Sequence, residues 1–240
     1  MTPQPALRRV TAVTSVILLG GLSLSGCALL PDASSAAAVP TATAAPVSGF
    51  ESQFTTDGSL TLSSQVADQL EVRLDMWAVE PKQTRLWAPD GDKSFGFAVN
   101  VYDGRVDEKA VLAQKRRVFL SNVTITSVAL QSLSDGSTQS TQNAFQFSAD
   151  PRTLVPTDTI RSDRGLLLNS FQGGLLVPSM TIHQLPADTT GITLSFALDV
   201  WVEGAAGDEA SFGRQTVYQT VPIAIFPAAA TPAPTTSTNG

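Results

Sequence analysis

The chain has 240 residues, 42% of them hydrophobic, and a formal net charge of −6, because 21 acidic residues outnumber 15 Lys and Arg. This acidic balance argues against a nucleic-acid partner, since such binding requires Lys and Arg to neutralise phosphates. It argues equally against electrostatic docking on anionic lipid. The single cysteine excludes an intramolecular disulfide, so we expect a domain stabilised by an ordinary apolar core.

The N-terminal segment has the parts of a bacterial export signal. Arg8 and Arg9 form a positively charged region, and a mostly apolar run follows over residues 10–24. This run is shorter than the ~20 apolar residues of a membrane-spanning helix, and it contains several Thr, Ser and Gly residues. A cleaved signal is therefore favoured over a permanent transmembrane anchor.

The stretch Leu24-Ser25-Gly26-Cys27 ends this run and contains the only cysteine. It resembles the lipobox of bacterial prolipoproteins, and the resemblance covers residues 1–27. It implies that the signal peptide 1–26 is removed and that Cys27 carries a diacylglyceryl group, which anchors the protein to the cell membrane on its extracytoplasmic face. Two acyl chains give stable anchoring, at ~0.8 kcal/mol per buried CH₂. The alternative is an ordinary secretory signal in which Cys27 is incidental.

Two segments have the composition of chains that do not fold by themselves. Residues 27–49 are rich in Ala, Pro, Ser and Thr, and residues 227–240 have the same character. Such segments bury too little apolar surface to offset the entropy lost on ordering. We therefore expect an Ala/Pro/Thr-rich tether at 27–49, a folded domain at 50–226 and a disordered tail at 227–240.

The folded domain shows the period-two alternation that is typical of half-buried strands. The alternation is clearest at 70–76, 95–101 and 192–202, while 118–130 and 216–226 are rich in Val, Ile, Thr and aromatic residues. We expect a strand in each of these five segments.

Turn and helix signals complete the pattern. Pro222 predicts that the last strand lies at a sheet edge or contains a bulge. Only 106–117 has a helical pattern, enough for one or two turns, whereas a βαβ fold requires several helices. Asp-Gly pairs separate candidate strands, as turns require, at 57–58, 90–91, 103–104 and 135–136.

These observations predict an all-β fold, an antiparallel immunoglobulin-like β-sandwich of two packed sheets. The strand at 192–202, the Gly-rich turn at 204–213 and the closing strand with Tyr218 resemble the terminal hairpin of bacterial immunoglobulin-like domains. The chain lacks the Cys…Trp…Cys spacing of antibody domains. The resemblance therefore bears on the fold alone.

Catalytic motifs are scarce in this sequence. It contains no G-x-S-x-G elbow, no His/Cys cluster with metal-binding spacing and no Gly-rich phosphate loop. The only histidine, His183, lies between apolar neighbours on an expected strand, and we interpret it as structural in preference to a catalytic base. We expect no catalytic residue, metal or cofactor. The alternative is an exported cell-wall glycan hydrolase that uses Asp and Glu converging from different strands, as glycosidases do.

The segment 150–174 contains more charged residues than a connecting loop requires. Its alternating acids and arginines could form an ion-pair network that fixes a crossing between sheets. They could also form a binding surface, because loops on a rigid scaffold carry recognition and Arg is enriched at binding hot spots. The residues in question are Arg152, Arg161, Asp163 and Arg164.

Trp77 and Trp201 fall on the polar phase of their alternating strands. This phase predicts either an exposed aromatic patch for carbohydrate or protein, or sheet faces that are partly covered by loops. With the four charged residues of 150–174, the two tryptophans make up the candidate binding surface. The function expected from the sequence is a non-enzymatic binding or structural module of the cell envelope, with a protein or glycan partner.

Overall fold

The computed structural model describes residues 50–170 and 173–226. The predicted signal peptide 1–26, the tether 27–49 and the tail 227–240 lie outside the described residues, and so do all four lipobox residues, Leu24, Ser25, Gly26 and Cys27.

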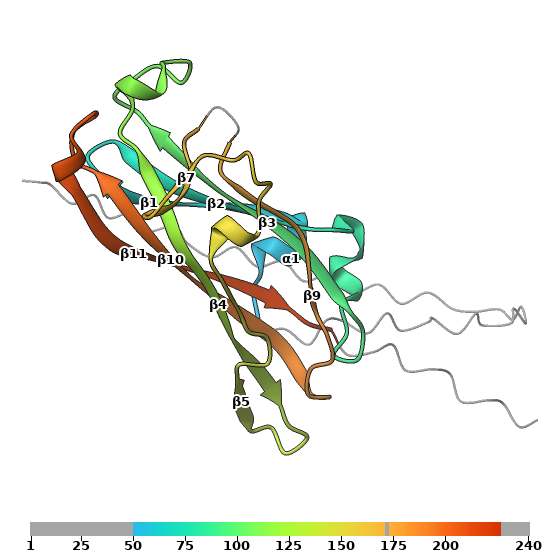
Figure 1. The fold of residues 1–240 in the computed structure, drawn as a ribbon. Helices are drawn as coiled ribbons and strands as arrows, with labels where there is room; N and C mark the ends of the chain where they lie inside the picture. Colours follow the sequence, from blue (N-terminus) through green and yellow to red (C-terminus); the bar gives the residue numbers. More distant parts are fainter. Residues whose placement is uncertain (1–49, 171–172, 227–240) are drawn as a thin grey trace, which may run out of the picture. The chain divides into compact units, whose positions relative to one another are not determined.

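The described residues form two antiparallel sheets, which confirms the all-β sandwich (Figure 1). The four-stranded sheet has the order β1-β2-β3-β9, with bounds Ser59–Ala67, Leu70–Ala78, Lys93–Asp103 and Leu175–Ile182. The seven-stranded sheet has the order β11-β10-β4-β8-β7, and β5 and β6 also pair with β4. Its strands are β4 (Val118–Ser132), β5 (Thr138–Gln142), β6 (Phe147–Ala149), β7 (Arg161–Ser162), β8 (Gly165–Leu167), β10 (Thr189–Glu203) and β11 (Phe212–Ala224).

All five strands expected from the alternation are present, as β2, β3, β4, β10 and β11. Along β2, buried residues alternate with half-buried ones over its whole length, so one side of the strand faces the core. The core lies between the sheets, where the rings of Phe97 on β3 and Phe196 on β10 meet edge to face at 5.5 Å.

The strand order places the second and third strands in the same sheet, since β2 pairs with β3 along its full length. In an immunoglobulin domain the second and third strands lie in different sheets. The terminal hairpin is as expected, with β10 and β11 paired from Gly191 to Glu203. Pro222 lies on β11, an edge strand of the larger sheet, as its missing N–H predicts.

The helix expected at 106–117 is wrong: the segment contains only the 3₁₀ turn η2 (Leu112–Gln114). A short helix depends on an apolar face that packs against the domain, and Val111 instead is 64% exposed. A helix that the sequence analysis missed is α1 (Gln53–Asp57). Its signals were a capping Ser52, whose side chain accepts from Thr55 N, and Gly58 in the left-handed conformation. The remaining 3₁₀ turns are η1 (Pro81–Leu86), η3 (Pro151–Thr153) and η4 (Glu209–Ser211).

Of the four Asp-Gly pairs, Asp135-Gly136 joins two strands that pair with each other, β4 and β5. Gly136 has a φ of 82°, which glycine adopts at little cost. The other three pairs lie in turns beside α1, η1 and β3. All four Asp-Gly pairs therefore lie at or beside the end of a helix or strand, but of the four it is Asp135-Gly136 that forms a hairpin turn.

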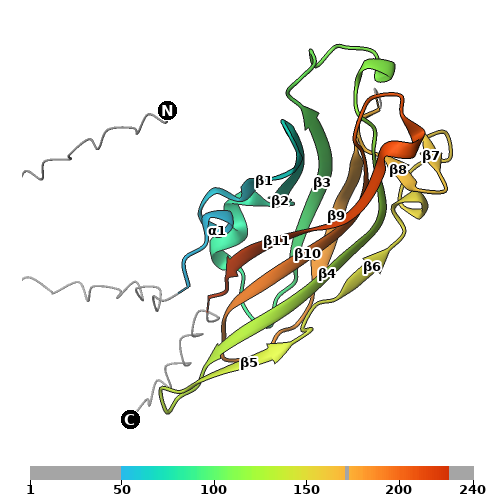
Figure 2. The ribbon, with the colours of Figure 1, turned by 90° about the vertical axis from the view of Figure 1, so that its left-hand side faces the viewer.

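Side-chain amides close one side of the sandwich, where β1 and β11 lie next to each other (Figure 2). Gln215 on β11 donates to the carbonyl oxygen of Val66 at 2.9 Å, and Gln219 donates to that of Leu62 at 3.4 Å. An edge strand otherwise presents a row of unpaired backbone groups to other chains. The two glutamines therefore protect the free edge of β1.

Candidate binding face

The outer surface of β4, β10 and β11 gathers aromatic and charged side chains. Strand register places Trp201 between Phe119 and Arg214. Two residues earlier on β10, Asp199 lies between Asn122 and Thr216. The next row brings Tyr218 beside Ala197. We use the name aromatic–arginine face for the following residues: Arg164, Trp201, Phe212, Arg214 and Tyr218.

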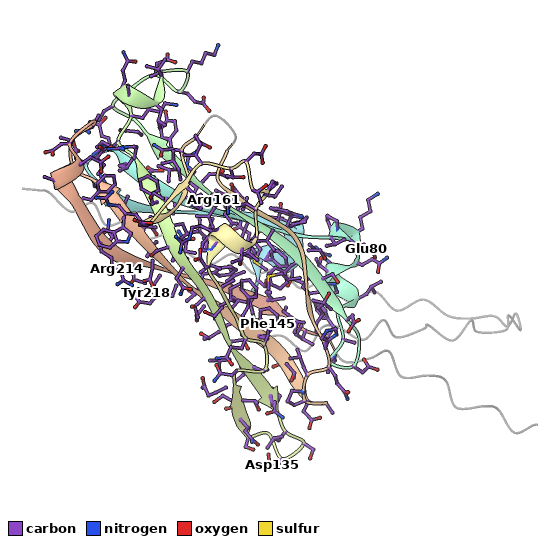
Figure 3. All side chains as sticks on the ribbon, in the orientation of Figure 1. Glu80, Asp135, Phe145, Arg161, Arg214 and Tyr218 are labelled. Atoms are coloured by element: carbon purple, nitrogen blue, oxygen red, sulfur yellow. The ribbon has the colours of Figure 1, made fainter. Side chains whose placement is uncertain are left out.

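The exposed part of this face lies on β11, where Arg214 and Tyr218 project from the ribbon (Figure 3). Tyr218 is 74% exposed, and Trp201 is half-buried. Arg214 lies 3.4 Å from the carboxylate of Asp199, whose other oxygen accepts from the Thr216 hydroxyl at 2.6 Å. Trp, Tyr and Arg, which this face gathers, are the residue types enriched at interaction hot spots.

At the end of the face nearest the β10–β11 turn, two arginines pack on one aromatic ring and pair with one carboxylate. The guanidinium of Arg164 lies 4.3 Å from the centroid of the Phe212 ring, and that of Arg117 lies 5.3 Å from it. Both arginines also pair with Glu209, at 3.0 Å and 2.6 Å. Arg164, predicted from the sequence as a site residue, is thereby brought from the 150–174 segment onto the same face as Trp201.

Beneath this end, Glu203 is buried and held by Arg117. The Arg117 guanidinium lies 2.6 Å from one Glu203 oxygen, and the Arg117 backbone N–H donates to the other at 2.7 Å. Burial raises the pKa of Glu203, but the hydrogen bonds from Arg117 and from the Gly207 N–H outweigh it, so that the pKa lies below its ordinary value. Glu203 therefore acts as a fixed negative charge that orients Arg117.

The side chain of Arg116, the residue before Arg117, contacts the end of the four-stranded sheet instead. Its guanidinium pairs with Asp103 at the end of β3 and also donates to the Asp68 carbonyl at 2.7 Å. Burial raises the pKa of Asp103, but hydrogen bonds from the Arg116 side chain and from backbone N–H groups of Arg105 and Arg116 bring it below the ordinary value. Two adjacent arginines thus connect the ends of both sheets.

The other charged residues of 150–174 mostly hold their own loop. Arg152 pairs with Asp150 at 2.6 Å and donates to the Ser162 carbonyl, and this pairing lowers the pKa of Asp150. Arg161 donates to the carbonyls of Arg152 and Pro156. Asp163 is exposed. Within this segment, Arg152 forms a local ion pair, Arg161 donates to backbone carbonyls of the same loop, and Arg164 lies on the aromatic–arginine face.

Trp77 does not lie on the aromatic–arginine face. It lies on the outer side of the four-stranded sheet, opposite Gly96 on β3, and is half-buried. Any side chain at 96 would collide with the Trp77 ring and with the Pro178 carbonyl. The six residues proposed from the sequence are therefore distributed over the loop 150–164 and the outer surfaces of both sheets.

His183 was expected on a strand, but β9 ends at Ile182 and the His183 side chain is 78% exposed. Its Nδ1 lies 2.9 Å from the Asp92 carboxylate. Among the described residues, the buried carboxylates are Asp103 and Glu203, each paired with its own arginine. With lowered pKa values, neither holds a proton near neutral pH that it could donate as a general acid.

Phe212, Arg214 and Tyr218 were not predicted from the sequence as site residues. A signal was present, because these residues share one phase of the alternation along β11. Over 50–170 and 173–226, no group of three or more His, Cys, Asp or Glu could hold a metal ion. In the same residues, no helix has the length and apolar character needed to cross a membrane.

The fold and this face define an all-β sandwich domain whose outer surface carries aromatic rings and ion-paired arginines. No protein-family model matches the chain, and no curated protein matches it either. Among solved structures it is similar to Clostridium perfringens delta-toxin, with 10% identity, a TM-score of 0.18, and coverage of 68% of this chain and 87% of the toxin. A likeness this weak carries no argument about fold or function.

Proposed function

We propose that the protein is a lipid-anchored, extracytoplasmic binding module of the cell envelope and that it is not an enzyme. The anchor rests on the lipobox-like Leu24-Ser25-Gly26-Cys27 behind a short apolar run. The binding role rests on one structural observation, the aromatic–arginine face, on which the Tyr218 ring is 74% exposed.

A protein partner suits this face better than a nucleic acid or an anionic membrane does. Tyr, Trp and Arg are the residues enriched at protein–protein hot spots. The net charge of −6 opposes polyanions.

The alternative of a glycan hydrolase receives no specific support. Retaining and inverting glycosidases need a carboxyl group that is protonated at working pH beside one that is ionised. The buried carboxylates of the described residues, Asp103 and Glu203, both have lowered pKa values and are committed to Arg116 and Arg117.

Cys27→Ala tests the anchor. We expect the variant to leave the membrane fraction or to remain as an uncleaved precursor, because the atom that accepts the lipid is gone, while the domain folds unchanged. Cell fractionation and the intact mass of the product measure both effects. Ser34→Ala, a change outside the lipobox-like stretch, is the matched control and should fractionate as the wild type does. A Cys27→Ala protein that stays in the membrane with the wild-type processed mass would refute the anchor.

A further inference from the structure

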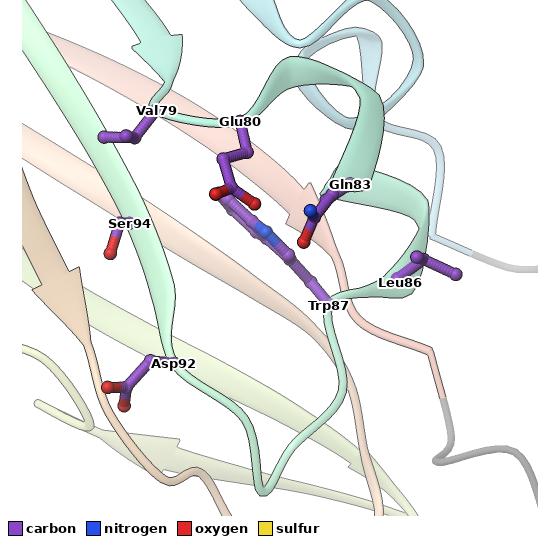
Figure 4. Close-up of a pocket in the computed structure, with 7 residues that line it drawn as sticks. All are labelled: Val79, Glu80, Gln83, Leu86, Trp87, Asp92 and Ser94. Carbon is purple, nitrogen blue, oxygen red and sulfur yellow. The ribbon is translucent and has the colours of Figure 1, made fainter.

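A separate pocket, of about 300 Å³, lies between η1 and the start of β3 (Figure 4). This volume is at the lower end of the ~300–1,000 Å³ of small-molecule sites. The pocket lies on the described part of the chain where β2 ends, away from the aromatic–arginine face. It is lined by Val79, Glu80, Gln83, Leu86, Trp87, Asp92 and Ser94.

The walls of this pocket are held in place by buried contacts. The Trp87 ring packs on Phe54 at a centroid distance of 5.8 Å, and its carbonyl accepts from Phe226 N at 2.8 Å. Beside it, the ammonium of the buried Lys93 donates to the carbonyls of Ala88, Pro89 and Gly91. These bonds fix the loop that carries Asp92. Trp87 and this loop are therefore held in place before a ligand binds.

One hydrogen-bond donor in this pocket is open to a ligand. Trp87 is only 6% exposed, and among the described residues the buried side-chain atoms without a partner are Thr189 Oγ1 and Gln219 Oε1, not the Trp87 indole nitrogen. The indole N–H therefore reaches solvent in the pocket and can donate to a ligand. Figure 4 shows the indole together with the carboxylate of Glu80 and the amide of Gln83, and with Asp92 and Ser94 across the opening.

The lining combines donors and acceptors in a way that selects hydroxyl groups. The Trp87 indole can only donate, the carboxylate oxygens of Glu80 and Asp92 offer acceptors, and Gln83 and Ser94 can do both; one Asp92 oxygen already contacts His183. An ammonium ligand has no acceptor for the indole, and an anion is repelled by the two carboxylates. A hydroxyl both donates and accepts, so that a ligand with several hydroxyls can match donors and acceptors of this lining alike.

Apolar side chains complete the site. Leu86 is 74% exposed and Val79 47% exposed, and both line the pocket. A pyranose ring presents C–H groups as well as hydroxyls, and its C–H groups match these side chains. We propose that this pocket binds a neutral sugar unit. The proposal is independent of the lipid anchor and of the aromatic–arginine face.

The test is a titration of the ¹⁵N-labelled full chain with neutral sugars, read at the tryptophan indole N–H resonances. The probes are D-glucose, D-mannose and N-acetyl-D-glucosamine, with D-glucosamine and D-glucuronate as the cationic and anionic comparisons. We expect at least one neutral sugar to shift the Trp87 resonance at millimolar concentration, while the resonances of Trp77 and Trp201 stay in place. Trp87→Phe identifies the Trp87 resonance by its loss.

Variants on the pocket wall make the test specific. Glu80→Ala and Gln83→Ala change exposed side chains and should each weaken sugar binding by up to about tenfold, the effect of one lost hydrogen bond. Lys82→Ala, on the same 3₁₀ turn but outside the lining, should bind as the wild type does. Both wall variants retain the Trp87 reporter.

Three results would overturn the proposal. The first is the absence of any Trp87 shift with all three neutral sugars. The second is tighter binding of glucosamine than of N-acetylglucosamine, which would mark a cation site. The third is sugar affinity that is unchanged in both Glu80→Ala and Gln83→Ala, which would place binding elsewhere on the chain.

Discussion

Replacing Arg116 by alanine is expected to lower the free energy of unfolding by about 3–5 kcal/mol, the usual cost of removing one partner of a buried ion pair. The Arg116 and Asp103 side chains are 2% and 3% exposed. Two guanidinium nitrogens contact the Asp103 carboxylate, at 2.7 Å and 3.1 Å. Without Arg116 that carboxylate stays buried and loses its main counter-charge. Urea denaturation at neutral pH measures the loss.

Arg105→Ala is the matched control, because Arg105 approaches the same carboxylate at 3.7 Å but is 40% exposed. It should cost less than about 1 kcal/mol, as exposed pairs do. Asp103→Asn combined with Arg116→Ala should recover part of the loss, since no buried charge remains. An Arg116→Ala protein as stable as the Arg105→Ala protein would contradict the buried pair.

The two buried carboxylates, Asp103 and Glu203, make the free energy of unfolding depend on pH. The pKa of Asp103 in the folded protein lies below its ordinary value of 3.8, and that of Glu203 lies below 4.5. Their contribution to stability is therefore complete above these ordinary values and is lost as the pH falls through the lower, folded-state pKa values. In Arg116→Ala, burial raises the pKa of Asp103, so that the difference in stability from wild type should narrow on acidification.

Phe97→Ala is expected to cost about 3–5 kcal/mol, the range for a large aromatic residue removed from a core. Phe97 is fully buried on β3 and meets Phe196 of the opposite sheet edge to face at 5.5 Å. The substitution therefore leaves a cavity between the sheets and also removes an aromatic pair, worth about 0.5–1.5 kcal/mol. Chemical denaturation of the purified chain gives the value.

Tyr218→Ala provides the comparison for Phe97→Ala, because it removes an aromatic ring that is 74% exposed. Its effect should stay within about 0.5 kcal/mol, as for other surface changes. A large loss from Tyr218→Ala would mean that its ring is packed, and a small loss from Phe97→Ala would contradict the two-sheet core.

Periodicity predicted the strands because a half-buried strand must alternate, and β2 does so over its full length and β10 over 192–202. It could not predict the sheet to which a strand belongs. Trp77 and Trp201 share the outward phase, yet they lie on different sheets. Sheet membership depends on pairing between distant segments, and the alternation of a single strand carries no information on it.

The buried charges show the same limit. Arg116 and Arg117 stood at the end of an expected helix, but their partners are Asp103 and Glu203, the latter 86 residues away. The charge pattern within 150–174 left open an ion-pair network or a binding surface, and the ion pair found there, Arg152–Asp150, is local. It could not predict that Arg164 reaches Phe212 and Glu209, because those residues lie in the last hairpin.

The most direct test of the proposed function is photo-crosslinking in living cells from position 218 of the full chain. We predict a reproducible protein adduct that is lost when Trp201 and Arg214 are both replaced by alanine. A photoreactive group at Leu176, which is 57% exposed on the four-stranded sheet, serves as the control and should give no such adduct. No adduct from position 218, or the same adduct from position 176, would contradict a binding role for the aromatic–arginine face.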